Sequence, residues 1–461
     1  MRYVSTRGRA PVLGFEDTML TGLARDGGLY VPEEVPVLSS GDIAALAGLP
    51  YEEVAVRIMA PFVADAFDEA TFAGMVERAY SGFGHDARAP LVQLGPNHHL
   101  LELFHGPTLA FKDFAMQLIG QAFEHTLTRR GERVAIVGAT SGDTGSAAIE
   151  AFRGLDAVDV FILYPHGRVS EVQRRQMTTP TEANVHALAV AGHFDDCQAR
   201  LKEMFNDFPF RDRVGLAGVN SINFARVLAQ VVYYFTAATA LGAPHREVSF
   251  TVPTGNFGDI FAGHIAKRMG LPIRKLVVAT NQNDILHRCL TTGEYRTGEV
   301  HPSISPSMDI QVSSNFERAL HLAYDGDGSA VAQLMTELRS GGFTVSQGAL
   351  QALREVYASG RVSEDETSAK IATIRKRTGE LLCPHSAVGV RVAEAHLDDT
   401  PMVTLATAHP AKFPDAVEAV TGIRPPLPAR MADLFDRAER VTRVDNDLAA
   451  LEAVIDERRA A

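Results

Sequence analysis

Short apolar runs alternate along the chain with longer segments in which apolar residues recur at helical spacing. The apolar runs RVAIVGAT (133–140), DVFILYP (159–165) and PMVTLATAHP (401–410) predict buried strands, and FARVLAQVVYYFTAATALG (224–242) predicts a long buried helix. Alternation of this kind is typical of strand–helix units around a mainly parallel sheet. The pattern therefore predicts an α/β protein.

Other segments extend this prediction. VHALAV (185–190) predicts a strand, and DDCQARLKEMFNDF (195–208) predicts a helix with Asp195 or Asp196 as its N-cap. A run of amphipathic helices is predicted between about 315 and 395. The first ninety residues are turn-rich, as in GLARDGGLYVPEEVP. We place a domain boundary after residue 92, which gives an N-terminal domain (1–92) and a second region (93–461).

Composition and charge narrow the classes of function. The chain has 461 residues, 46% hydrophobic and 22% charged, with a formal net charge of −12. This charge argues against nucleic acid or an acidic membrane as a partner, and an anionic substrate needs a local basic cluster. No apolar run reaches the length of a membrane span, and the N-terminus lacks the apolar stretch of a secretory signal. Three widely spaced cysteines predict reduced thiols, so we expect a cytoplasmic protein.

Two glycine-rich turns follow predicted strands and open predicted helices. They are GATSGDTGSAA (138–148) and PTGNFGDIFAG (253–263). Backbone N–H groups converge at such turns and favour an anion, although a glycine can also serve the turn alone. Neither turn has the Gly-Lys-Ser/Thr of a Walker A loop or the G-x-G-x-x-G of a dinucleotide loop. Two such turns favour a ligand with two anionic ends, or two anionic ligands.

A single lysine, Lys112, stands in the apolar stretch FHGPTLAFKDFAMQLIG (104–120). Such a lysine either buries only its stem or has a depressed pKa and acts as a nucleophile, and the stretch alone favours the first reading. A reactive lysine together with a phosphate cradle is the minimum equipment of a pyridoxal phosphate (PLP) enzyme. Thr407, directly after a strand, is a candidate partner for the pyridine nitrogen or simply a residue at a strand end.

Seven motifs in order resemble those of the threonine synthase family, in the branch with a sizeable N-terminal domain. The motifs are LFHGPTLAFKDF, TSGDTGSAA, QMTT, VNSINFARVLAQ, VPTGNFGD, SPSMDIQVSSNFER and LATAHPAKF. The opening segment FEDTMLTGLARDGGLYVPEE resembles that branch as well, so the match runs from about residue 3 to 420. Any one of these motifs alone is weak, but the ordered set is specific.

The resemblance implies a fold-type-II PLP enzyme of the tryptophan synthase β-like class. Such an enzyme has two α/β open-sheet subdomains plus the N-terminal domain, with the smaller subdomain, about 133–225, inserted in the larger one. The implied reaction converts O-phospho-L-homoserine and water into L-threonine and phosphate by γ-elimination and β-addition of water. This is the last step of threonine biosynthesis.

The motifs also imply roles for individual residues. Lys112 is implied to form the Schiff base with PLP, and Thr407 to lie against the pyridine nitrogen. The implied phosphate cradle consists of Gly255, Asn256, Phe257, Gly258 and Asp259. The residues implied to bind substrate are Ser141, Gly142, Asp143, Thr144 and Gly145 at its α-carboxylate, and Asn220, Ser221 and Arg226 at its phosphate. The last three also fit a capped helix start with a surface arginine.

Asp143 departs from the wider fold-type-II pattern, in which many relatives have asparagine. A carboxylate beside the cofactor's phenolate is repulsive unless a proton is shared. The role of Asp143 therefore stays open, and we assign this loop mainly through Ser141, Thr144 and backbone amides.

Rival readings remain. A phospho-lyase with the same fold gives 2-oxobutyrate instead of threonine, and a non-enzymatic ligand sensor can use the same scaffold. The histidines form no HxxxH or HExxH pair, so we expect no metal. The resemblance also favours a monomer, or at most a weak homodimer.

Overall fold

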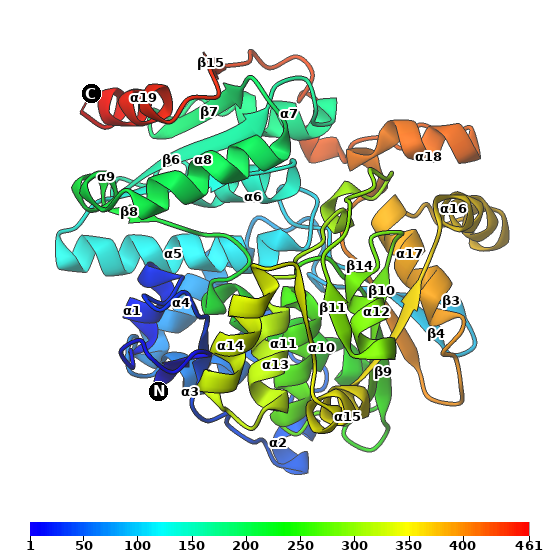
Figure 1. Ribbon diagram of the computed structural model, residues 1–461. Helices are drawn as coiled ribbons and strands as arrows, with labels where there is room; N and C mark the ends of the chain where they lie inside the picture. The colour runs from blue at the N-terminus through cyan, green and yellow to red at the C-terminus, as the bar shows by residue number, and fades with distance from the viewer. Residues whose placement is uncertain (461) are drawn as a thin grey trace.

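The computed structural model describes residues 1–460. Its larger sheet carries the strand that precedes the second glycine-rich turn and the strand predicted near the C-terminus (Figure 1). Among the described residues, the strands of this sheet lie in the order β13-β10-β9-β14-β4-β3. All neighbours are parallel except β3 and β4. The strands are β3 (Leu91–Gly95), β4 (His98–Glu102), β9 (Val248–Pro253), β10 (Ile273–Thr280), β13 (Tyr357–Arg361) and β14 (Met402–Ala406). The predicted strand at 401–410 and the strand predicted before the turn at 253–263 are thus confirmed.

Buried helices pack beside this sheet. The predicted helix 224–242 is α10 (Phe224–Ala240), which is buried along almost its whole length because it is apolar on all sides. It packs against α11 (Gly258–Arg268) and α5 (Lys112–Arg130). The predicted helical run 315–395 is confirmed as α13 (Phe316–Ala323), α14 (Gly328–Leu338), α15 (Gln347–Val356), α16 (Glu364–Thr378) and α17 (Pro384–Ala393). Nearby lie α12 (Ile285–Thr292), β11 (Glu294–Arg296), η1 (Pro306–Met308) and β12 (Gly342–Thr344).

The smaller sheet forms the upper lobe in Figure 1 and is parallel throughout its described length, with the order β15-β7-β6-β5-β8. Its strands are β5 (Val134–Ala139), β6 (Val158–Pro165), β7 (Val185–Val190), β8 (Leu216–Ala217) and β15 (Thr442–Val444). Its helices are α6 (Asp143–Phe152), α7 (Glu171–Thr178), α8 (Phe194–Asn206), α9 (Phe208–Val214) and α19 (Leu448–Ala460). The predicted segment 133–225 supplies all of these strands except β15, which the C-terminal part of the chain adds. That C-terminal part follows η2 (Pro410–Lys412), α18 (Pro414–Thr421) and η3 (Ala429–Met431).

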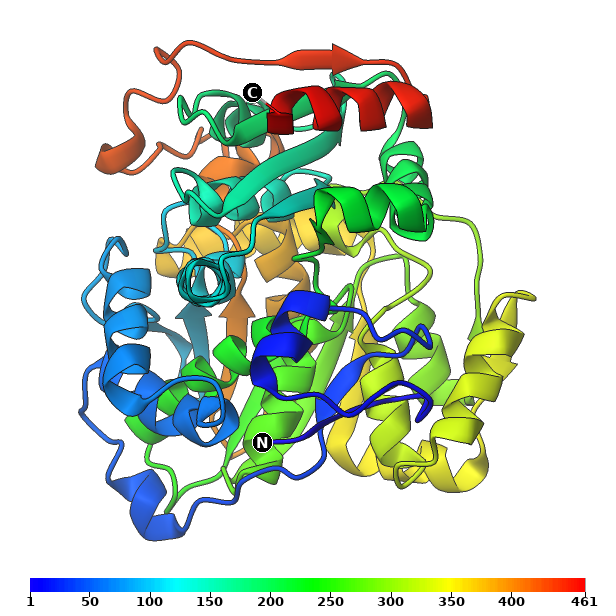
Figure 2. The ribbon, with the colours of Figure 1, turned by 90° about the vertical axis from the view of Figure 1, so that its left-hand side faces the viewer.

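The N-terminal elements share their core with the rest of the chain. The rings of Tyr3 and Phe224 lie 5.4 Å apart, as do those of Tyr51 and Phe114. The N-terminal helices therefore cover α5 and α10. Figure 2 shows α5 end-on between the two sheets. The division at residue 92 stays a prediction, because these apolar contacts run across it. The elements are β1 (Tyr3–Ser5), α1 (Phe15–Thr21), β2 (Tyr30–Pro32), α2 (Ser40–Ala44), α3 (Tyr51–Val63) and α4 (Glu69–Tyr80).

The predicted cap of α8 is wrong. The N-cap is His193, and both candidate aspartates lie inside the helix. The carboxylate of Asp196 instead accepts a hydrogen bond of 2.7 Å from the backbone N–H of His193. An acidic residue in the first turn satisfies a free N–H as well as a cap does, so the pattern alone does not separate the two positions. Within residues 1–460, no helix combines the length and the hydropathy needed to cross a bilayer.

Candidate active site

Lys112 lies at the start of α5, between the two sheets. It is only 9% exposed, and its Nζ lies 3.3 Å from Oδ2 of Asp143 and 4.7 Å from the ring centre of Phe111. Burial lowers the pKa of Lys112, the charge of Asp143 raises it in part, and the charges of Lys412 and Arg226 lower it further. The structure therefore excludes the reading in which this lysine only buries its stem.

Asp143 is the first residue of α6 and has two cationic partners. Its Oδ1 accepts hydrogen bonds from Nζ of Lys412 at 2.8 Å and from Nε2 of Gln173 at 2.9 Å, while Oδ2 faces Lys112. Burial alone would raise the pKa of Asp143, but the charges of Lys412 and Lys112 outweigh burial and hold this pKa below its usual range. The carboxylate is thus ionised, and the charges of the two lysines balance it. The sequence alone left open how this charge would be balanced.

Residues 141–145 run from the loop after β5 into the first turn of α6. The hydroxyl of Thr140 accepts hydrogen bonds of 2.9 Å from the backbone N–H groups of Gly142 and Gly145. Two of the amides expected to face a ligand are therefore already used inside the loop. Ser141 and Thr144 are partly exposed, and they remain the side chains of this loop that can reach a ligand.

The second glycine-rich turn joins β9 to α11 and is held by its carbonyl groups. Ser313 donates to the carbonyl of Gly255 at 2.6 Å, and the side chain of Asn315 donates to that of Asn256 at 2.9 Å. Space at Gly255 is closed, because a Cβ there would lie 2.6 Å from the carbonyl oxygen of Ser307. Among the described residues, no hydrogen-bond acceptor faces the backbone N–H groups of Gly255, Asn256, Phe257, Gly258 and Asp259.

This turn fits a phosphate group. Free N–H groups at a helix start carry partial positive charge, and here they lie at the carboxyl end of a parallel strand, where open α/β sheets bind ligands. The carboxyl group of Asp259 is turned toward α10 instead, where the hydroxyl of Tyr233 donates to Oδ1 at 2.5 Å. Burial raises the pKa of Asp259 to about 7, and its Oδ2 has no partner among the described residues.

Thr407 follows β14 and lies beside the lysine loop. Its carbonyl oxygen accepts a hydrogen bond of 2.9 Å from the N–H of Phe111, the residue before Lys112. The residue is 7% exposed. The large sheet thus brings Thr407 next to Lys112, although the two are far apart in the sequence.

Arg226 is a buried cation with few partners. The residue is 3% exposed, its Nε has no hydrogen-bond partner in the described structure, and one NH group reaches the carbonyl of Val219 at 3.4 Å. Burial lowers the pKa of Arg226 to about 10. The alternative interpretation, in which Arg226 is a surface arginine, is therefore wrong. Asn220 is exposed and Ser221 is half-buried, and the cap of α10 is Asn223.

Sequence reasoning missed several residues around the lysine. Lys412 stands inside the quoted motif LATAHPAKF but was not singled out, although a lysine in an apolar run is the same signal that marked Lys112. Ser313 and Asn315 stand inside the motif SPSMDIQVSSNFER, but neither they nor Gln173 has a residue type that by itself indicates a role. They join the site only because α7 and the segment before α13 pack against the two glycine-rich turns.

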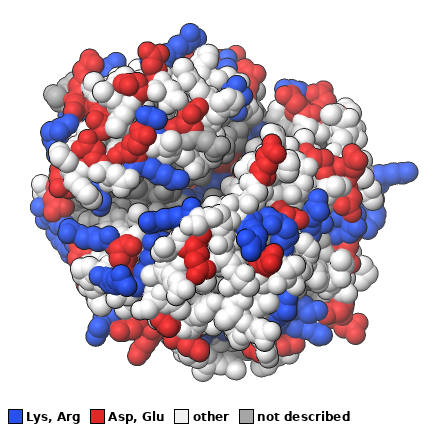
Figure 3. Space-filling model, viewed as in Figure 1, with Lys and Arg blue, Asp and Glu red and all other residues white. Residues whose placement is uncertain are grey.

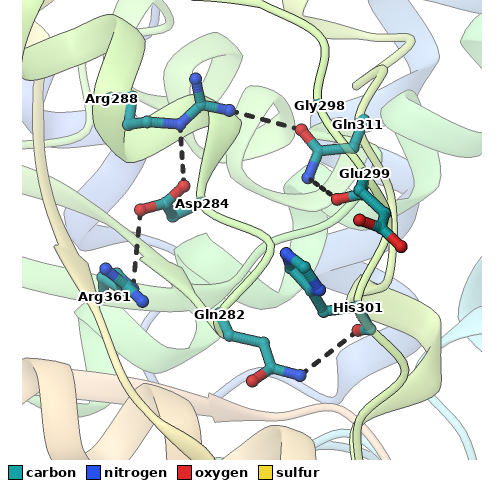
Figure 4. Close-up of a pocket in the computed structure, with 8 residues that line it drawn as sticks. All are labelled: Gln282, Asp284, Arg288, Gly298, Glu299, His301, Gln311 and Arg361. Atoms are coloured by element: carbon teal, nitrogen blue, oxygen red, sulfur yellow. Dashed lines mark hydrogen bonds and ion pairs between the residues drawn. The ribbon is translucent and has the colours of Figure 1, made fainter.

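A separate cavity lies at the same edge of the large sheet (Figure 4). It has a volume of about 550 Å³ and is lined by residues that follow β10, lie in α12, end β13 and flank η1 on both sides. Three of its charged groups pair with one another: Asp284 accepts from Arg288 at 2.8 Å and lies 3.5 Å from Arg361. Neither Lys112 nor the N–H cradle contributes to it, so we assign no role to it in the active site.

The fold and the site together define a class of protein. A buried lysine with a lowered pKa, a free N–H cradle and a hydroxyl at a strand end meet between two mainly parallel sheets, and the surface is hollowed between these two parts (Figure 3). This is the arrangement of a fold-type-II, PLP-dependent enzyme.

Comparison with known proteins narrows the class to a family. Three family profiles match in order: "Threonine synthase N terminus" (residues 2–80), "Pyridoxal-phosphate dependent enzyme" (87–334) and "Threonine synthase, C-terminal" (386–455). The threonine synthase of Pseudomonas aeruginosa is 56% identical over 459 residues, 99% of this chain and 98% of that protein. The chain belongs to the threonine synthase family.

Solved structures agree over the whole length. The crystal structure of PLP-bound threonine synthase from Brucella melitensis superposes with a TM-score of 0.98 at 57% identity, covering 100% of both chains. Threonine synthase from yeast gives a TM-score of 0.93 at 39% identity, over 100% of this chain and 99% of that one. The predicted fold class and cofactor are thereby confirmed.

Proposed function

We propose that the protein converts O-phospho-L-homoserine and water into L-threonine and phosphate. The observation that carries this proposal is a second anion site. The N–H cradle after β9 suits the cofactor's phosphate, and the buried guanidinium of Arg226, whose charge acts on the pKa of Lys112, suits a phosphate on the substrate. A dehydratase acting on an unphosphorylated amino acid has no use for this second site.

We assign the residues as follows. Lys112 carries the cofactor, and when bound, PLP withdraws electrons from the substrate so that its Cα and Cβ protons become acidic. The lowered pKa of Lys112 suits a base that takes the Cα proton and returns it later in the cycle. Residues 255–259 hold the cofactor's phosphate and Thr407 faces its pyridine nitrogen. Ser141 and Thr144 bind the α-carboxylate.

Arg226, with Asn220 and Ser221, holds the substrate's phosphate and stabilises the charge that develops as phosphate leaves Cγ. Such stabilisation by fixed donors is a large contribution in sites that exclude water. The planar fork of an arginine matches the oxygens of a phosphate better than a lysine does. Elimination at Cγ followed by addition of water at Cβ then gives threonine.

The test is to purify the protein, record its absorption spectrum, add O-phosphohomoserine and identify the products. We expect the visible band of lysine-bound PLP and formation of threonine, both lost in Lys112→Ala. Lys202→Ala, which changes an exposed lysine, serves as the matched control. Formation of 2-oxobutyrate would instead favour the phospho-lyase, and a bound cofactor without turnover would favour the ligand sensor.

We also propose a cytoplasmic location and a monomer, or at most a weak homodimer. The three cysteines are free and buried, in keeping with a reducing compartment. The large exposed apolar side chains come from separate segments, as with Val37 and Phe208. Light scattering after gel filtration tests the oligomeric state, and the prediction that no metal is needed is tested by activity after dialysis against a chelator.

A further inference from the structure

Lys412 is a fully buried lysine that the proposed function does not use. It ends η2, has no exposed surface, and donates 2.8 Å hydrogen bonds to Oδ1 of Asp143 and to the carbonyl oxygen of Thr108. Thr108 belongs to the loop that leads into α5, where its N–H and hydroxyl are both bound by Asp113. Lys412 therefore joins the start of α6 to the loop that carries Lys112.

Asp143 lies between two cations, and only one of them keeps a permanent charge. The nitrogen of Lys112 loses its fixed positive charge when it holds the cofactor, and it regains a positive charge when, displaced by the substrate, it takes up the Cα proton. A buried carboxylate left with no partner costs several kcal/mol and takes up a proton instead. Lys412 is bound to no other acidic group among the described residues, so it can serve Asp143 throughout.

We propose that Lys412 is a positioning residue, the permanent counter-ion that keeps the carboxylate of Asp143 ionised and directed at the nitrogen of Lys112 while Lys112 gains and loses its charge. This inference rests on the proposed attachment of PLP to Lys112. It also explains how this chain tolerates an aspartate where many fold-type-II relatives have a neutral asparagine: the lysine supplies the opposite charge, and the Asp143–Lys412 pair is neutral as a unit.

The pair acts on Lys112 in opposite directions. Asp143 stabilises a protonated Lys112 nitrogen and Lys412 destabilises it, because like charges repel. Other groups also face this site from the surrounding helices and are the same in every variant compared: Arg226 on α10, Asp259 on α11, His385 on α17, and Asp113, which faces Lys412 from α5. The pair can therefore be tested by changing each member separately.

The experiment is a pH titration of the visible absorption band of the holoenzyme, which follows the proton on the Lys112 nitrogen. Removing one close charge shifts such a midpoint by about one to three pH units. We expect Lys412→Met to shift it upward and Asp143→Asn to shift it downward. The double variant should fall between the two single variants. Lys412→Arg keeps the charge, so its midpoint should stay near that of the wild type despite altered packing.

An unchanged midpoint in a folded Lys412→Met variant would overturn the proposal, and so would a Lys412→Arg variant that shifts as far as the methionine variant. If Lys412→Met does not fold, Asp143→Asn is compared with the double variant. Loss of Lys412 must still raise the midpoint there, and equal midpoints refute the role. A wild type that lacks the band refutes the cofactor assignment itself. Production of 2-oxobutyrate refutes only the proposed reaction and leaves the titration decisive.

Discussion

Replacing Arg226 by methionine should make the protein more stable and less active. Burial lowers the pKa of this guanidinium from 12.5 to about 10. Because the folded-state pKa of a cation is depressed, the charged form is disfavoured in the fold, and this cost is fully present below about pH 10. At about 1.4 kcal/mol per pKa unit the cost is about 3 kcal/mol. Methionine fills similar space without the charge, so we expect about 1–3 kcal/mol of added stability.

The same change should reduce activity toward the phosphorylated substrate. Hydrogen bonds to a charged group are worth about 1.5–3 kcal/mol each. Two of them from one guanidinium amount to about 3–6 kcal/mol, which corresponds to a fall in kcat/KM of about 10²- to 10⁴-fold. Gain of stability with loss of function is the signature of a cation kept for a ligand rather than for the fold.

Urea unfolding at neutral pH, with and without inorganic phosphate, measures both effects. In the holoenzyme, where the cofactor's phosphate fills the N–H cradle, inorganic phosphate should stabilise the wild type and not Arg226→Met, because only the former keeps the second anion site. Arg213→Met is the matched control: this arginine is exposed and pairs with Asp456 at 2.7 Å, so its loss should change little. The reasoning is refuted if Arg226→Met is destabilised, or if it keeps full activity and the response to phosphate.

Three further changes test other parts of the site. Gly142→Ala should destabilise the protein by about 1–3 kcal/mol in thermal unfolding, because φ is +139° and the new Cβ would lie 2.3 Å from the side chain of Gln173; normal stability would contradict this geometry. The raised pKa of Asp259 means that the fold favours a neutral carboxyl group. Stability and retention of PLP should therefore decline as the pH rises from 3.8, the pKa of this group in the unfolded chain, through about 7, its pKa in the folded protein. The test measures bound cofactor after dialysis at about pH 6 and about pH 9, and the decline should be smaller in Asp259→Asn. An equally steep decline in that variant would show that another group causes the pH dependence. Residues 93–461 expressed alone should be insoluble, because they expose the apolar faces of α5 and α10 that Tyr3 and Tyr51 cover; a soluble, folded fragment would show that the first 92 residues are dispensable.

Much of the fold is readable from local pattern. Continuous apolar runs give β5, β6 and β14 because these strands are buried on both faces, and α10 is apolar on all sides for the same reason. Strand β13 (YASGR) has no such pattern and was not predicted. It is a strand because β10 offers it a parallel edge in register. The N-terminal elements likewise depend on a core shared with α5 and α10 rather than on one of their own.

The site likewise has some features that local sequence indicates and others that depend on the tertiary structure. Its lysine and its glycine-rich turns could be found in the sequence, because a reactive amine and a phosphate cradle each need particular residues in one short stretch. The charges that tune the lysine could not be found in this way. Asp143, Lys412 and Arg226 come from three distant segments, and electrostatic interaction depends on distance in space and on burial. The sequence by itself thus determined which groups are present, and only the tertiary structure decided that a buried aspartate lies between two lysines beside an arginine with few partners.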